Sequence, residues 1–148
     1  MHHPASITSF RPSRADGRAA RIGLAVVELV VALGAVYGGV MLLADADELG
    51  ADRAWLQGSI FSDFTVPGLV LLFVIGGGML AAAAAAALMP SRAGLLAELM
   101  ALVLIGWGFV ETITIGWQGT GQLVLVGLFV VIPALLMLLL GSRVRGHR

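Results

Sequence analysis

The sequence contains no cysteine, which excludes disulfides, thiolate-bound metals and cysteine nucleophiles. It contains no lysine either, because all 9 basic residues are arginines. Charged residues make up only 12% of the chain, against roughly a quarter in soluble domains. So little charge cannot cover the surface of a soluble domain of 148 residues, and the composition indicates a membrane protein.

Apolar residues fill the chain instead. They account for 59% of the sequence, and the mean hydropathy is +0.98. Four apolar runs are each about as long as the ~20 residues that a helix needs to cross the hydrocarbon core of a bilayer. We expect spans at about 22–44, 67–89, 93–115 and 123–140. The predicted fold class is all-α: a four-helix transmembrane bundle of residues 21–142 with an outer interfacial loop, a flexible basic tail at 1–20 and a second basic tail at 143–148.

The arginines are distributed asymmetrically about these spans. Eight of the 9 precede span one, lie between spans two and three, or follow span four: Arg11, Arg14, Arg18, Arg21, Arg92, Arg143, Arg145 and Arg148. Because basic residues accumulate in cytoplasmic segments, this pattern places both termini in the cytoplasm and residues 45–65 outside. Exclusive use of arginine and abundant alanine are typical of a GC-rich bacterial genome. We therefore expect a multi-pass protein of a bacterial inner (cell) membrane.

The first span also shares features with a secretory signal peptide. The residues "ADA" at 44–46 have the small-x-small pattern of a cleavage site after a basic start and an apolar run. However, the apolar region of a signal peptide is usually about 7–15 residues long, and this run is longer and contains Glu28. We interpret residues 22–44 as a retained span, with cleavage as the alternative.

The segment before Pro67 is predicted to cap the bundle on the outer side. Pro67 suits the first turn of a helix, where a missing backbone N–H costs little, so the chain is expected to enter the bilayer there. The apolar side chains of the cap can lie at the membrane–water boundary or pack on the helices: Trp55, Leu56, Ile60, Phe61 and Phe64.

No catalytic or metal-binding pattern is complete. Asp45, Asp47 and Gly50 resemble the start of a calcium-binding loop, but Leu56 stands where such a loop needs a bidentate glutamate. Asp63 and the serines beside it have no histidine on their side of the membrane, and no glycine-rich phosphate loop is present. We expect a non-enzyme without metal or cofactor. The tail arginines are explained by membrane orientation, so no nucleic-acid partner is expected.

Glu28 and Glu98 lie within apolar spans, where an ionisable side chain is costly and is therefore a functional candidate. Glu28 follows Arg21 by seven residues and Glu98 follows Arg92 by six, so both lie about 9–10 Å beyond their basic anchors. No arginine, lysine or histidine lies inside a predicted span to neutralise them. Two carboxylates that meet in a low dielectric can share a proton, which makes Glu28 and Glu98 a candidate proton-handling pair. In the alternative interpretation each acid reaches toward the cytoplasmic interface or a neighbouring hydroxyl group.

Glu111 belongs to the outer end of span three, one turn after Trp107, and faces the same compartment as the loop. Arg53 is the only arginine on that side. A contact of Glu111 with Arg53 or with a loop amide would dock the loop on the bundle. The alternative is a ligand-binding carboxylate, in an outer polar site with Arg53, Trp107 and Asp63 as further candidates.

Small residues are concentrated in the predicted spans. Ala81–Ala87 are seven consecutive alanines, and Gly34 and Gly38 form a GxxxG pair. Small side chains let helix backbones approach closely. We interpret both features as packing within one bundle, with homodimerisation through Gly34 and Gly38 as the alternative.

The stretches "WLQGSIFSDFTVPGLVLLFVIGG" and "LIGWGFVETITIG" resemble a family of small, uncharacterised four-span bacterial membrane proteins. The resemblance covers spans one to three and the loop, and it implies the architecture without implying an activity. The matching positions are Trp55, Leu56, Gly58, Phe61, Asp63, Pro67, Gly68, Gly76, Gly77, Gly106, Trp107 and Glu111.

A second similarity lies around Glu28, where "AVVELV" is similar to the first span of small multidrug-resistance transporters, which also have four spans and a membrane-embedded glutamate. The long acidic loop and the one-sided arginines depart from that family's dual-topology members. The sequence favours a structural or accessory membrane component, and a small proton-coupled transporter using Glu28 and Glu98 is the alternative. The lipid bilayer is the expected partner, and a membrane-protein partner or a homo-oligomer is left open.

Overall fold

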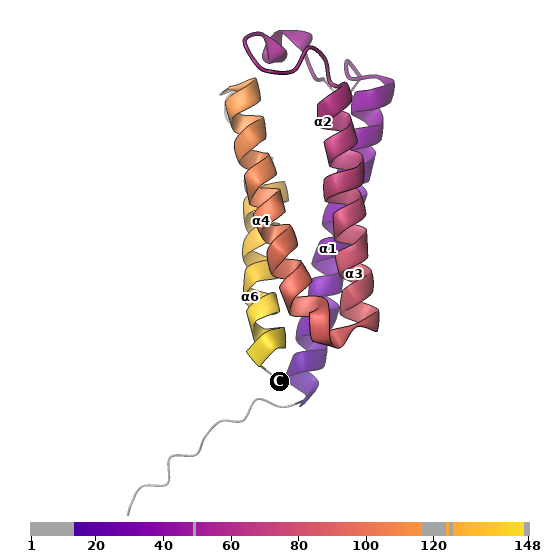
Figure 1. Ribbon diagram of the computed structural model, residues 1–148, viewed down its shortest axis with the longest axis vertical. Coiled ribbons are helices and arrows are strands. Elements are labelled where there is room, and N and C mark those ends of the chain that lie inside the picture. Colours follow the sequence, from indigo (N-terminus) through magenta and orange to yellow (C-terminus); the bar gives the residue numbers. More distant parts are fainter. Residues whose placement is uncertain (1–13, 49, 117–123, 125, 147–148) are drawn as a thin grey trace, which may run out of the picture.

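The computed structural model describes residues 14–48, 50–116, 124 and 126–146, which form a bundle of helices (Figure 1). Its elements are, in chain order, α1 (Arg14–Ala44), the 3-10 helix η1 (Arg53–Leu56), α2 (Thr65–Leu69), the π-helix η2 (Val70–Gly76), α3 (Gly77–Leu88), α4 (Pro90–Ile115), the π-helix η3 (Gly127–Val131) and α6 (Ile132–Gly146). The segments α2, η2 and α3 follow one another without a break and make one span, as do η3 and α6.

Four helical stretches are long and apolar enough to cross a membrane: Asp16–Ala44, Thr65–Leu88, Pro90–Thr114 and Gly127–Gly146. Their outer faces carry large apolar side chains that are more than half exposed, such as Leu33, Phe73 and Phe109. Helices have such faces where they meet lipid rather than water. The predicted all-α, four-helix transmembrane bundle is therefore confirmed.

The helices extend further than the apolar runs predicted. Helix α1 begins at Arg14, so residues 14–20 of the expected flexible tail are helical. Asp16 in its first turn favours a helix N-terminus, and Ala20 is buried in the core. At the other end α6 continues to Gly146, because Val144 is also buried in that core. Residues 1–13, the expected start of span four at 123, and residues 147–148 lie outside the described residues.

Each span packs against its neighbours in the chain, and α6 closes the ring against α1. Helices α1 and α4 contact each other only sparsely, so they face each other across the bundle. Figure 1 shows the start of α1 and the end of α6 at one end of the bundle and the loop with η1 at the opposite end.

Close contact between α1 and the second span occurs at Gly39. A Cβ atom placed there would lie 2.7 Å from the backbone nitrogen of Leu72 and 2.9 Å from the carbonyl oxygen of Gly68. The GxxxG pair of Gly34 and Gly38 lies beside this close contact and not in it. A Cβ on Gly34 would make only ordinary contact, 3.8 Å from Phe129, and a Cβ on Gly38 would meet nothing within 4 Å. The backbones therefore approach one position after Gly38.

The run of alanines belongs to α3. Ala82, Ala85 and Ala86 are buried against the neighbouring helices, whereas Ala81, Ala84 and Ala87 face outward. The predicted packing role of this run is confirmed, since its small side chains let the bundle close around α3.

Candidate functional site

Glu98 lies on α4 and faces the last turns of α6. Its Oε1 atom is 2.6 Å from Nη2 of Arg145, in a close ion pair without a directed hydrogen bond. Glycines make this approach feasible, because a Cβ on Gly94 would lie only 2.7 Å from the carbonyl oxygen of Gly141. The expectation that no arginine neutralises the intramembrane acids is wrong for Glu98. The reason is that α6 stays helical past residue 140 and brings Arg145 to the carboxylate.

Glu28 lies on the core-facing side of α1, one turn after Leu24 and one turn before Ala32, both of which are fully buried. Its side chain is 0% exposed, and neither carboxylate oxygen has a hydrogen-bond partner among the described residues. No water-sized space therefore adjoins the carboxyl group in the described part of the bundle. Burying an unpartnered acid costs free energy, so Glu28 reduces the stability of the bundle.

The predicted pair of Glu28 and Glu98 would need a hydrogen bond between the two carboxyl groups. Glu28 makes no such bond with the described residues, and α1 faces α4 across the bundle. Glu98 instead pairs with Arg145, near the end of the bundle where α6 ends. This position agrees with the alternative interpretation, in which Glu98 reaches toward an interface. Neither interpretation describes Glu28, whose buried carboxyl group reaches neither an interface nor a hydroxyl group of the described chain.

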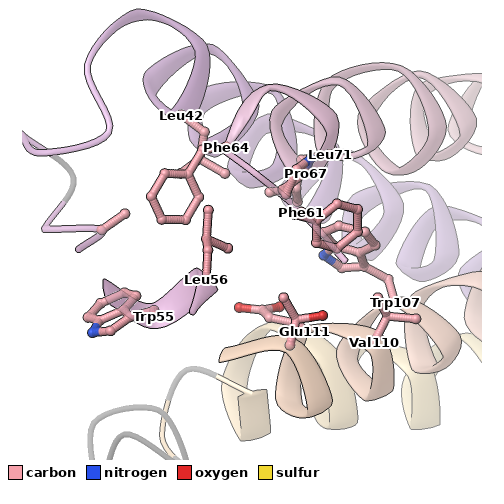
Figure 2. A pocket seen from close by; sticks show the side chains of 12 residues that line it. Leu42, Trp55, Leu56, Phe61, Phe64, Pro67, Leu71, Trp107, Val110 and Glu111 are labelled. Atoms are coloured by element: carbon pink, nitrogen blue, oxygen red, sulfur yellow. The ribbon is translucent and has the colours of Figure 1, made fainter. Parts of the chain in front are cut away.

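The loop between α1 and α2, residues 45–64, folds over the end of the bundle that lies opposite to the start of α1 and the end of α6. Between the loop and the helices is a cavity of about 240 Å³, here named the outer cavity (Figure 2). Figure 2 shows Glu111 and Trp107 of α4 on one side of it and Leu42, Phe64 and Leu71 on the other. The cavity is lined by Leu42, Ala51, Trp55, Leu56, Phe61, Phe64, Pro67, Leu71, Trp107, Val110, Glu111 and Thr114.

Short-range hydrogen bonds of polar loop residues shape the lid of the outer cavity. The side chain of Asp52 accepts from Ala54 N at 2.8 Å and caps η1, and the side chain of Asp63 accepts from Thr65 N at 2.8 Å where α2 begins. Such side-chain acceptors satisfy backbone donors at helix starts. The backbone N–H and the hydroxyl group of Thr65 hold the pKa of Asp63 below its usual value.

Apolar contacts hold the loop against the bundle. Ala51, Leu56 and Phe64 are buried together, with Trp55 and Phe61 packed against them. These residues therefore pack against the helices or one another, as one of the two predicted arrangements of the loop required. The side chain of Ile60 does not, because it is 90% exposed.

The four candidate residues of the outer polar site are divided between two cavities. Glu111 and Trp107 line the outer cavity. Arg53 and Asp63 line a second, polar cavity of about 290 Å³, together with Asp45 and Asp47. A contact of Glu111 with Arg53 is not among the ion pairs of the described residues.

Sequence reasoning missed the far wall of the outer cavity, which Leu42, Pro67 and Leu71 form. It also missed Arg145 as the partner of Glu98. Leucines at helix ends carry no pattern that separates a cavity wall from a lipid contact. For Arg145 a signal exists, since it follows Gly141 by one helical turn and would share its face if the helix continued.

The resemblance of residues 55–77 and 104–116 to a four-span bacterial family stays a prediction, and the chemistry of the site rests on its own geometry. Comparison with known proteins finds no family model, no curated protein and no solved structure that matches the chain.

Proposed function

We propose that the chain is a non-catalytic, structural or accessory component of a bacterial inner membrane. The sealed core around Glu28 is the observation that supports this proposal most strongly. Proton-relaying acids in membrane proteins face water-filled cavities or pathways, so that a proton can enter and leave. Glu28 is 0% exposed, and the described bundle gives its carboxyl group no contact with water from either end.

The proposal includes an orientation with both termini in the cytoplasm. Arginines gather at the end of the bundle where α1 begins and α6 ends, among them Arg18, Arg21, Arg92, Arg143 and Arg145. The opposite end carries the acidic loop. Under the positive-inside rule, this arrangement favours a cytoplasmic location for the arginine-rich end. A reporter active only in the cytoplasm should therefore work when fused after Arg148, and activity only outside would overturn the orientation.

The functional proposal is tested by proton flux in reconstituted vesicles with a pH gradient. We expect the wild-type protein and Glu28→Gln to show no flux above empty vesicles. We also expect Glu28→Gln to be as stable to heat as the wild type or slightly more stable, because an amide is less costly to bury than a carboxylate. Glu48→Gln, the same change in an exposed acid of the loop, is the control.

A small proton-coupled transporter is the second candidate. The observation that favours it is the unpartnered carboxyl group of Glu28, since membrane proteins seldom retain such a costly group without a use. This function would require Glu98 to leave Arg145 during transport. A wild-type flux that disappears in Glu28→Gln at unchanged thermal stability would overturn the accessory role and establish this one.

A further inference from the structure

We propose that the outer cavity binds a small organic cation, an ammonium group on an apolar body of about ten non-hydrogen atoms. The proposal goes beyond the accessory role and rests on the composition, size and electrostatic surroundings of the cavity. Each of these points to the same chemical class of ligand.

Glu111 supplies the negative charge for such a ligand. It is the only ionisable residue among the described residues that line the outer cavity. In Figure 2 its carboxyl group lies between Leu56 and the ribbon of α4, inside the space that the loop covers. It has no hydrogen-bond or ion-pair partner in the described part of the chain. A cationic ligand would provide the missing partner.

Aromatic side chains surround the rest of the space. Trp55 and Phe61 from the loop, Phe64 at the start of α2, and Trp107 from α4 all line the outer cavity. The negative faces of aromatic rings attract ammonium groups, and an aromatic cage with a carboxylate is a recurring means of binding organic cations. The leucines and Pro67 complete an apolar lining suited to a hydrocarbon body.

The charge around the cavity favours cations over anions. The described part of the loop that covers the cavity carries one arginine, Arg53, against five acids: Asp45, Asp47, Glu48, Asp52 and Asp63. An excess of one sign of charge raises the local concentration of ligands of the opposite sign. An anionic ligand would meet this acidic loop first and Glu111 afterwards.

The size of the cavity separates a small amine from a lipid. An apolar cavity of about 150 Å³ holds benzene, with six carbon atoms. In proportion, the 240 Å³ of the outer cavity accommodates about ten non-hydrogen atoms. A phospholipid with two acyl chains is several times larger. A small arylalkyl amine such as phenethylamine therefore fits inside the cavity completely, whereas a phospholipid would have to extend out of it.

The experiment compares three probes of one shape and different charge: phenethylamine, 2-phenylethanol and phenylacetate. Each is titrated at pH 7 into the full-length protein in detergent micelles, with calorimetry and tryptophan fluorescence as readouts, since Trp55 and Trp107 line the cavity. We expect saturable binding of the amine, weaker binding of the alcohol and no binding of the carboxylate.

Variants of Glu111 test the charge. Glu111→Gln should weaken amine binding roughly ten- to a hundred-fold, the usual effect of removing one partner of a charged hydrogen bond. Glu111→Asp keeps the charge and should retain part of the affinity, which separates loss of charge from loss of fold. Glu48→Gln makes the same change outside the cavity and should bind the amine as the wild type does.

Three outcomes would overturn the proposal: equal affinity for all three probes, unchanged amine affinity in Glu111→Gln, or a co-purified lipid that the amine fails to displace from the outer cavity. The test is independent of proton flux. Flux through Glu28 with intact amine binding would remove only the accessory role, whereas absent flux without amine binding would remove only this ligand site.

Discussion

Replacing Gly39 by alanine tests the tight contact between α1 and the second span. The new Cβ atom would lie 2.7 Å from Leu72 N, which is 0.7 Å inside the 3.4 Å at which ordinary contact begins. It would also lie 2.9 Å from the carbonyl oxygen of Gly68. Both atoms belong to backbone and cannot rotate away, so the two helices must move apart.

The neighbouring glycine provides a matched control. A Cβ on Gly38 would meet nothing within 4 Å. Both alanine variants gain about 1 kcal/mol of helix propensity, so this contribution cancels in the comparison. Gly39→Ala alone carries the overpacking cost of about 1–3 kcal/mol. The free energies of unfolding of the two variants should therefore differ by about 1–3 kcal/mol, with Gly39→Ala the less stable.

Unfolding by sodium dodecyl sulfate in mixed micelles, followed by circular dichroism, measures this difference. Gly38→Ala should unfold at the same detergent fraction as the wild type or a higher one, and Gly39→Ala at a lower one. Equal unfolding free energies for the two variants would refute the reasoning, because the backbones would then not meet at Gly39.

Three further predictions concern the ion pair, the start of α2 and the loop. A double-mutant cycle with Glu98→Gln and Arg145→Met should give a coupling free energy of about 1 kcal/mol or less, because Arg145 is 50% exposed; strict additivity would speak against the pair. The pKa of Asp63 is lowered on folding by hydrogen bonds from Thr65, so its contribution to stability is present above its unfolded value of 3.8 and lost as pH falls through the folded value. Asp63→Ala should therefore be less stable than the wild type at pH 7, with a gap that closes below pH 3.8 in unfolding titrations, and a gap independent of pH would contradict this. Acrylamide should quench Trp55 only weakly in a variant whose other tryptophans are phenylalanines, because Trp55 packs on the buried loop cluster; quenching as strong as that of free tryptophan would show an exposed loop.

Much of the architecture was predictable because a bilayer permits few solutions. Backbone polar groups inside it must bond within their own segment, so each apolar run of sufficient length becomes a helix. The helix ends were less predictable: α1 begins at Arg14 and α6 ends at Gly146, well outside the apolar runs. A helix need not end where its hydrocarbon contact ends, and burial of Ala20 and Val144 in the shared core favours the longer helices.

The candidate site was predictable in its members and not in its pairings. Because Glu111 and Trp107 lie near the end of span three, the sequence predicted them at the loop end of the bundle. In the structure they line the outer cavity there. It did not show that Arg53 turns to the neighbouring polar cavity. Loop turns made by local hydrogen bonds decide the direction of such a side chain, and those turns depend on where the loop meets the helices.

The sequence by itself determined that the chain forms four apolar helices, and its arginine distribution supports one orientation. Only the tertiary structure decided that Glu98 meets Arg145, that Glu28 is enclosed without a partner, and that Gly39 rather than Gly38 forms the seam. The physical reason lies in the solvent. In water a polar outer face marks the side of a helix that is not in the core, but in a bilayer lipid-facing and core-facing residues are both apolar. The rotation of each helix is then set by close packing of small residues and by the few polar contacts, which become visible only once the helices are assembled.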